Sequence, residues 1–341
     1  MTVNVYLPLL AAAGLGLIGP ALGRRLPPAV AAVLLTAAAL VTAVTSLASL
    51  ALLAGVAVLR VPRFAAEGRL SDAVLVHGPV SPLAGAVAGL ALLALLPFAV
   101  RAGTRLWHES ARTYRMAKAF SAHPAWPGIA VIHDPRAQAF AVPAIPALPG
   151  HAAIPTRIVA TDSLLRALDA AQRRAMLAHE QAHLRRHHHL YLLLTNLAAV
   201  ANPLLWRLPG AVTEATERWA DEDAAAAVGD REVLARALGR AALSNLSSLP
   251  RTVPAMAQAH VTERVRALMA PPPPRRRALA AVVGIAIAAT FWASIEAARE
   301  TEAFFDTARA AWHVTHEHTL AERDHATAAA TTTAAPPSSA S

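Results

Sequence analysis

The sequence contains no cysteine and only one lysine, Lys118. The lack of cysteine excludes a disulfide-stabilised scaffold, a zinc site with thiolate ligands and a cysteine nucleophile. Charged residues make up only 16% of the 341 residues, whereas a soluble globular chain has about 25%. Hydrophobic residues reach 55% and the mean hydropathy is +0.40. This composition argues against an ordinary soluble enzyme and excludes disorder for most of the chain.

The formal net charge of +9 comes almost entirely from arginine. Alanine, glycine and proline are abundant as well, so we attribute the basicity to overall composition. We therefore expect no direct binding of nucleic acid.

Four segments lack charged side chains and are long enough to cross a bilayer, which takes about 20 apolar residues. They are residues 5–22, 29–59, 83–100 and 278–295. The second is long enough that it must tilt or extend beyond the membrane.

Basic residues in short loops near span ends mark the cytoplasmic side. Arg24 and Arg25 follow the first span, a run of basic residues ending at Lys118 follows the third, and Arg275–Arg277 precede the fourth. We therefore expect a bacterial cell-membrane protein with its N-terminus outside, the block between the third and fourth spans in the cytoplasm, and its C-terminus outside.

The predicted organisation has four parts. Residues 1–101 hold three spans, 102–277 form a cytosolic domain, 278–295 are the fourth span, and 296–341 are a short outer tail that is disordered from about residue 326. Short strands are predicted at 128–134, 138–142 and 157–161, ahead of a helix that starts at an Asp169–Gln172 capping box. The predicted fold class is a mainly α integral membrane protein with an inserted α+β domain.

The chemistry is carried by His179-Glu180-Gln181-Ala182-His183, an H-E-x-x-H sequence. Residues four apart share a helix face, so His179 and His183 can bind one zinc ion. Glu180 is placed to act as a general base toward the attacking water. The inserted domain is therefore predicted to be a zincin-like metallopeptidase with one catalytic Zn²⁺.

Three residues compete as the third ligand. His189 stands at the spacing of H-E-x-x-H-x-x-G-x-x-H, but Arg186 replaces the required glycine, and we interpret the basic run 185–189 as a helix end near lipid headgroups. Glu217 leaves one coordination position open, as a catalytic zinc requires, and Asp221 one turn later can orient a ligand histidine. Glu214 lacks such an aspartate, so we favour Glu217.

Residues 190–206 are uncharged and lie between the two halves of this ligand set. A fifth span there would place Glu217 across the membrane from the histidines. We therefore expect a membrane-associated segment, bent at Asn202-Pro203, with the active site close to the membrane surface.

With these residues the chain resembles the BlaR/MecR-type integral-membrane zinc metallopeptidases. The likeness covers the four spans, the inserted block, His179-Glu180-x-x-His183, Glu217-x-x-x-Asp221 and the Gln138–Ala141 strand. It implies a signal-transducing endopeptidase that cleaves a cytosolic repressor, or itself. Related proteases also carry a histidine and an arginine near His260 and Arg264, which implies a role for these two in closure or in the transition state. The alternative there is an exposed helical arginine.

The best-known members carry an external penicillin-binding domain, which the short tail here cannot supply. Acylation by penicillins needs S-x-x-K, and the residue three before Lys118 is Arg115. We therefore expect no acylation of this chain.

Two other functions compete with this one. The first is a quality-control or processing protease of the HtpX or CAAX type. The second is a metal transporter or a non-catalytic zinc-binding scaffold, although a transporter would carry ionisable residues inside its spans. The expected partners are the lipid bilayer and a protein substrate, with a homo-oligomer left open.

Overall fold

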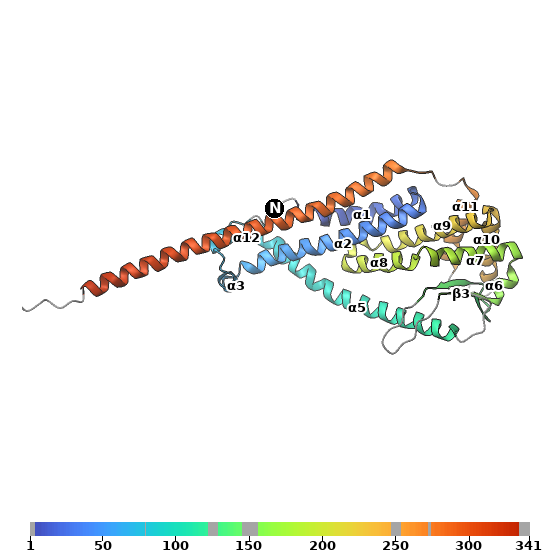
Figure 1. Cartoon of the computed structure of the whole chain (residues 1–341), viewed down its shortest axis with the longest axis horizontal. Coiled ribbons are helices and arrows are strands. Elements are labelled where there is room, and N and C mark those ends of the chain that lie inside the picture. The colour runs from blue at the N-terminus through green and yellow to red at the C-terminus, as the bar shows by residue number, and fades with distance from the viewer. Residues whose placement is uncertain are drawn as a thin grey trace, which may run out of the picture. The chain divides into compact units, whose positions relative to one another are not determined.

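The computed structural model of the chain describes residues 4–78, 80–121, 129–144, 156–246, 254–271 and 274–333. Most of these residues are helical (Figure 1). The chain forms two compact units: one comprises the residues up to Leu10, Thr45–Leu96 and those from Ala289 onward, and the other comprises Ala11–Val44 and Pro97–Ala288.

Within the part of the chain that the structure describes, four helices are long and apolar enough to cross a membrane. They are α1 (Leu7–Arg25), α2 (Pro28–Leu59), the Pro82–Arg105 part of α5 (Pro82–Ser121) and the Arg277–His318 part of α12 (Arg277–Thr333). Each overlaps one of the charge-free segments predicted from the sequence.

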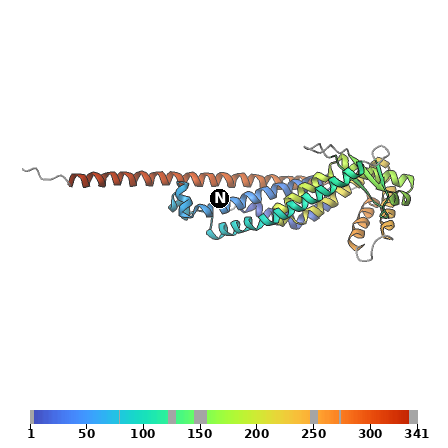
Figure 2. The ribbon, with the colours of Figure 1, turned by 90° about the horizontal axis from the view of Figure 1, so that it is seen from below.

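The predicted disorder from about residue 326 is wrong for residues 326–333, which are helical. Figure 2 shows α12 as one long helix, and it continues to Thr333. The segment beyond residue 325 is rich in alanine, the best helix former, which extends a helix already formed. The rest of the predicted disordered segment, residues 334–341, lies outside the described residues.

The first unit contains two short helices, α3 (Pro62–Glu67) and α4 (Asp72–Val76). They pack on α12 through Ala65, Leu75 and Ala308, which are all buried. The N–H of Ser71 donates to the carbonyl of Ala308 at 3.0 Å. A second cluster, with Val56 and Ala297 at its centre, joins α2, α5 and α12.

The second unit contains a three-stranded sheet of β1 (Ile129–Ile132), β2 (Ala139–Val142) and β3 (Arg157–Thr161). The order is β1-β3-β2, with β1 parallel and β2 antiparallel to β3. All three strands match the predicted segments. β2 therefore lies at one edge of the sheet.

Helices complete the second unit. They are α6 (Asp162–Ala167), α7 (Ala170–Arg185), α8 (His188–Ala201), the 3₁₀ turn η1 (Pro203–Leu205), α9 (Leu208–Val228), α10 (Arg231–Leu246) and α11 (Pro254–Met269). α7 contacts β2 and β3 and packs along α9 and α10. Their shared core includes Leu164, Ala175, Ala224, Leu234 and Leu268.

The predicted bend at Asn202-Pro203 is confirmed. Asn202 ends α8, and its side chain accepts a hydrogen bond from the N–H of Leu204. The chain then turns through η1 into α9, so α8 and α9 form a helical hairpin.

This α8–α9 hairpin packs against the parts of α1 and α2 that belong to the same unit. Leu35, Ala198, Leu205 and Val212 are buried together, and the Thr36 and Thr195 hydroxyls lie 3.1 Å apart. A Cβ on Gly16 would lie 1.9 Å from the carbonyl oxygen of Leu204. The tip of the α8–α9 hairpin can therefore approach α1 this closely only because residue 16 is glycine.

Candidate active site

Helix α7 carries both histidines of the H-E-x-x-H sequence. The predicted capping box is present: Asp169 accepts from the Gln172 N–H at 2.9 Å, and Gln172 accepts from the Asp169 N–H at 3.2 Å. The helix thus starts at a fixed residue, which sets the face that it turns toward α9. On that face the Nε2 atoms of His179 and His183 lie 3.1 Å apart.

Glu217 reaches the same point from α9. Its two carboxylate oxygens lie 3.5 Å from Nε2 of His179 and 3.5 Å from Nε2 of His183. His179 is buried, while His183 and Glu217 are half-buried. Within the described ranges, these three side chains form a group that could hold a metal ion.

The spacing of these atoms suits a tetrahedral metal. Zinc bound at its usual distances to nitrogen and oxygen holds its ligand atoms roughly 3.3–3.6 Å apart. The three observed distances are 3.1, 3.5 and 3.5 Å. The two Nε2 atoms and the Glu217 carboxylate are therefore close to the spacing that a zinc ion requires.

Asp221 lies behind His179, on its Nδ1 side, whereas Arg264 reaches into the cavity and brings Nη2 to 3.3 Å from Nε2 of His179. Oδ1 of Asp221 lies 3.0 Å from Nδ1 of His179, and the Asp221 side chain is 3% exposed. Arg264 donates to both Asp221 oxygens, at 2.8 and 2.6 Å, and its Nη1 lies 2.9 Å from Oε2 of Glu217. Arg264 is therefore a partly buried residue of the site and not an exposed helical arginine.

Arg264 is held in place through α11. The guanidinium of Arg231, at the start of α10, donates to the carbonyls of Leu268 and Ala267 at 2.9 and 3.0 Å. These bonds fasten the last turn of α11, one turn beyond Arg264.

The charges of the site favour a cation. Burial would raise the pKa of Glu217, but the hydrogen bond with His179 and the charge of Arg264 bring it to about 2. Asp221 has a pKa well below its usual range: burial acts against this, but the hydrogen bonds with Arg264 and His179 outweigh it. Two carboxylates thus face one arginine, and the excess negative charge lies beside the histidines.

The pKa values of the two histidines shift in opposite directions. Burial acts to lower the pKa of His179, but Asp221 and Glu217 outweigh it and raise that pKa to about 9. Burial and the neighbouring His179 lower the pKa of His183 to about 4. The same carboxylates that favour a proton on His179 would favour a metal cation beside it.

Glu180 points to the sheet side of the site. It is 7% exposed, and its carboxylate accepts a hydrogen bond from the main-chain N–H of Ala141 on β2. Burial raises the pKa of Glu180. The residue proposed as the base is thus fixed between the α7 helix and the edge strand.

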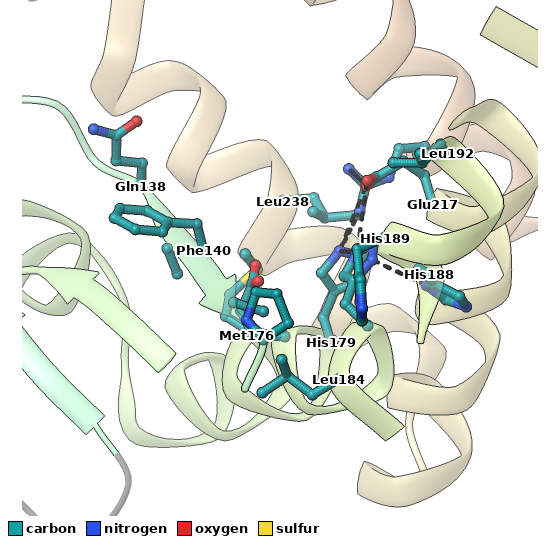
Figure 3. A pocket seen from close by; sticks show the side chains of 16 residues that line it. Gln138, Phe140, Met176, His179, Leu184, His188, His189, Leu192, Glu217 and Leu238 are labelled. Atoms are coloured by element: carbon teal, nitrogen blue, oxygen red, sulfur yellow. Dashed lines mark hydrogen bonds and ion pairs between the residues drawn. The ribbon is translucent and has the colours of Figure 1, made fainter. Parts of the chain in front are cut away.

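A cavity of about 430 Å³ opens over these groups (Figure 3). Residues 138–141 and Pro143 form one wall, and Leu192 on α8 stands at the other end. His179, Glu180, His183, Glu217 and Arg264 all line it. The metal group therefore lies in a cleft that runs from the sheet edge to the α8–α9 hairpin.

The model of peptidase family M48 matches residues 105–316. The chain belongs to peptidase family M48. It is therefore a metallopeptidase of that family, and its long apolar helices indicate a membrane protein. No curated protein and no solved structure matches the chain.

Within this M48 domain the structure brings together His179, Glu180, His183, Glu217 and Asp221, all of which were singled out from the sequence. The rival Glu214 faces elsewhere, with an oxygen 3.7 Å from Nη1 of Arg24.

Two other candidates lie outside the metal group. His189 lines the cavity but is exposed and does not belong to that group. His260 is exposed and does not line the cavity.

One residue of the site was missed. The run 185–189 contains the predicted helix end, but it also begins the next helix: α7 ends at Arg185, His187 adopts a left-handed conformation with φ 54°, and α8 starts at His188. This turn buries His188 to 1% exposure and brings its Nδ1 within 2.9 Å of Nδ1 of His183. Nothing in a run of three histidines signals which one turns inward.

Replacing Arg264 by Ala should lower the thermal stability of the metal-free protein. Removing one partner from a buried ion pair costs about 3–5 kcal/mol, and here Glu217 and Asp221 would both lose their counter-charge. The midpoint of thermal unfolding in detergent measures this, with exposed Arg236→Ala as the matched control on α10. Equal midpoints for the two variants would contradict it.

Proposed function

We propose that this protein is a membrane-embedded zinc-dependent endopeptidase in which His179, His183 and Glu217 bind a single Zn²⁺. The observation that carries this proposal is the meeting of the two histidine Nε2 atoms with the Glu217 carboxylate inside a cleft that also contains Glu180. A bound zinc ion supplies the Lewis acid that polarises the scissile carbonyl and the attacking water.

Glu180 is the general base in this proposal. Its carboxylate takes a proton from the attacking water and delivers it to the leaving amine. The hydrogen bond from the Ala141 N–H holds it beside the cleft. Asp221 fixes the orientation of His179, and Arg264 balances the charge of both carboxylates.

The substrate lies along β2 as an added strand. Gln138 accepts a hydrogen bond from the Thr161 N–H. Bonding alternates along an antiparallel pair, so the main-chain N–H and C=O of Ala139 and the C=O of Ala141 point to the outer edge, beside the Ala141 N–H that already binds Glu180. That edge forms the wall of the cleft, where an extended peptide can pair with it and pass Glu180.

We assign the protein to the BlaR/MecR-type branch, as a signal-transducing protease that cleaves a cytosolic repressor or itself. The support is the resemblance of the four apolar segments and of Glu217-x-x-x-Asp221. A comparison of the cellular proteomes of wild type and Glu180→Gln tests this assignment. We expect one small DNA-binding protein, or the protease itself, to be cut only in the wild type.

Other outcomes of that experiment support the rival functions. Accumulation of many damaged membrane proteins in the variant would favour quality control of the HtpX type. If the proteomes of wild type and Glu180→Gln do not differ from each other under either inducing or non-inducing growth, a transporter or a zinc-binding scaffold is favoured.

The proposed topology places the catalytic domain in the cytoplasm and both termini outside. Ala226 on α9 and Ala310 on α12 are exposed, and the chain has no cysteine of its own. In intact cells an impermeant thiol reagent should label Ala310→Cys and leave Ala226→Cys unlabelled until the cells are opened. The reverse pattern would mean that the arginine distribution misleads.

A further inference from the structure

A histidine that binds a metal through Nε2 carries its proton on Nδ1 and needs an acceptor there. For His179 the neighbouring acceptor is a carboxylate oxygen of Asp221, 3.0 Å away. For His183 the atom at that place is a second imidazole nitrogen, Nδ1 of His188, at 2.9 Å. The two histidines of the metal group therefore have different supports.

His188 is fixed more firmly than its place at a helix start suggests. Its ring centroid lies 5.0 Å from that of Trp219 and 4.8 Å from that of His183. Tyr191 closes the far side at 6.4 Å. The left-handed turn at His187 sets the direction from which the ring enters.

We propose that His188 is a positioning residue for the metal site. Its unprotonated Nδ1 accepts the hydrogen bond from Nδ1–H of His183 and so holds Nε2 of His183 toward the metal. This inference rests on the proposed zinc site and adds a residue that the H-E-x-x-H sequence does not contain.

The arrangement dictates the tautomer of His188. Since Nδ1 accepts, the proton must lie on Nε2, which is buried without a hydrogen-bond partner among the described residues. The surrounding aromatic rings of Trp219 and Tyr191 tolerate that N–H better than they would a charge. The neutral His188 ring adds no negative charge to the site. Of the two groups that face the histidine Nδ1 atoms, Asp221 is therefore the one that carries a charge.

Zinc affinity tests the proposal directly, measured by competition with a chromophoric chelator on the full-length protein in detergent. His188→Leu fills the space but cannot accept, and should weaken zinc binding about 10–100-fold, the usual cost of losing such a support. His188→Asn places an oxygen where Nδ1 was and should bind close to wild type. His189→Leu, the exposed neighbour, is the matched control and should bind like wild type.

Three results would overturn the role of His188. They are wild-type affinity in His188→Leu, equal weakening in the Leu and Asn variants, and equal weakening in His189→Leu. Unfolding midpoints of the metal-free proteins show whether a variant is folded. If the wild type itself binds no zinc, the proposed metal site fails, and that result is distinct from a failure at His188 alone.

A second, independent observation concerns a cavity of about 360 Å³ at the start of α2 and α12. It is lined by Pro27, Val30, Ala280 and three consecutive arginines, Arg275–Arg277. All three arginines are exposed, and none has an ion-pair partner among the residues that the structure describes. Both helices are candidate membrane spans, so the cavity sits where a span begins.

The geometry points to an anionic phospholipid as the occupant of this arginine cavity. Basic pockets between spans bind lipid headgroups, and guanidinium groups bind phosphate in a two-pronged manner. Val282 and Ile285, 61% and 69% exposed on the following turns of α12, give the acyl chain an apolar surface.

Native mass spectrometry of the purified protein with added phosphatidylglycerol tests this site. Wild type should retain one lipid molecule, and the triple variant Arg275→Gln, Arg276→Gln, Arg277→Gln should lose it while still binding zinc. The matched control removes the exposed Arg101, Arg105 and Arg112 of α5 and should retain the lipid. Equal retention by all proteins, or equal loss in both triple variants, would overturn the site, as would displacement of the lipid by an excess of inorganic phosphate.

Discussion

Replacing Glu180 by Gln should reduce peptide hydrolysis about 10²–10⁴-fold, because the amide cannot accept the proton of the attacking water. The metal should stay, since the ligand atoms belong to His179, His183 and Glu217. Turnover of an internally quenched peptide and metal content, both on protein in lipid nanodiscs, measure the two parts of this prediction.

The matched control is Glu263→Gln, an exposed glutamate on α11 next to Arg264. It makes the same chemical change outside the cleft and should leave hydrolysis unchanged. Wild-type turnover in Glu180→Gln would remove the proposed base from the mechanism. Loss of metal in that variant would show that Glu180 acts as a structural group instead.

Replacing Glu217 by Ala should cost most of the zinc affinity. The variant keeps two ligands and loses the carboxylate that meets both Nε2 atoms at 3.5 Å. The loss should therefore exceed the roughly 10–100-fold that removal of an outer support costs. Chelator competition on the purified protein measures it.

Glu214→Ala is the control for this change, because Glu214 lies one turn earlier on α9 and its carboxylate lies near Arg24 instead of the metal group. It should bind zinc like wild type. If Glu214→Ala loses more zinc affinity than Glu217→Ala, the third ligand is Glu214, and Asp221 no longer lies one turn after the ligand.

Local signals allowed much of this site to be predicted from the sequence. Asp169 and Gln172 fix the start of α7, and the spacing of His179 and His183 fixes their common face. The choice of Glu217 over Glu214 came from Asp221, four residues later, and the structure places Asp221 against His179. Each of these signals depends on residues within one or two turns of one another.

The unpredicted parts depend on packing between distant elements. Arg264 meets Asp221 across 43 positions, through α11, whose position is set by Arg231 on α10. His188 turns inward because His187 adopts a left-handed conformation, which is uncommon for a residue other than glycine. Local spacing predicts neither contact: the family resemblance implies a role for Arg264 but not its pairing with Asp221, and nothing in the sequence points to His188.

The packing of α9 couples the apolar helices α1 and α2 mechanically to the metal group. Its first turns, with Leu208 and Val212, are buried against α1 and α2, and Glu217 follows within the same uninterrupted helix. At 1.5 Å per residue, Val212 and Glu217 are only about 7.5 Å apart along the axis. α9 is thus one rigid helix. Its first turns pack among the apolar helices, and its middle carries the Glu217 ligand of the metal group. A small sliding or tilting of α1 or α2 would move the Glu217 carboxylate directly, and a shift of a few tenths of an ångström is enough to spoil or complete a set of metal ligands.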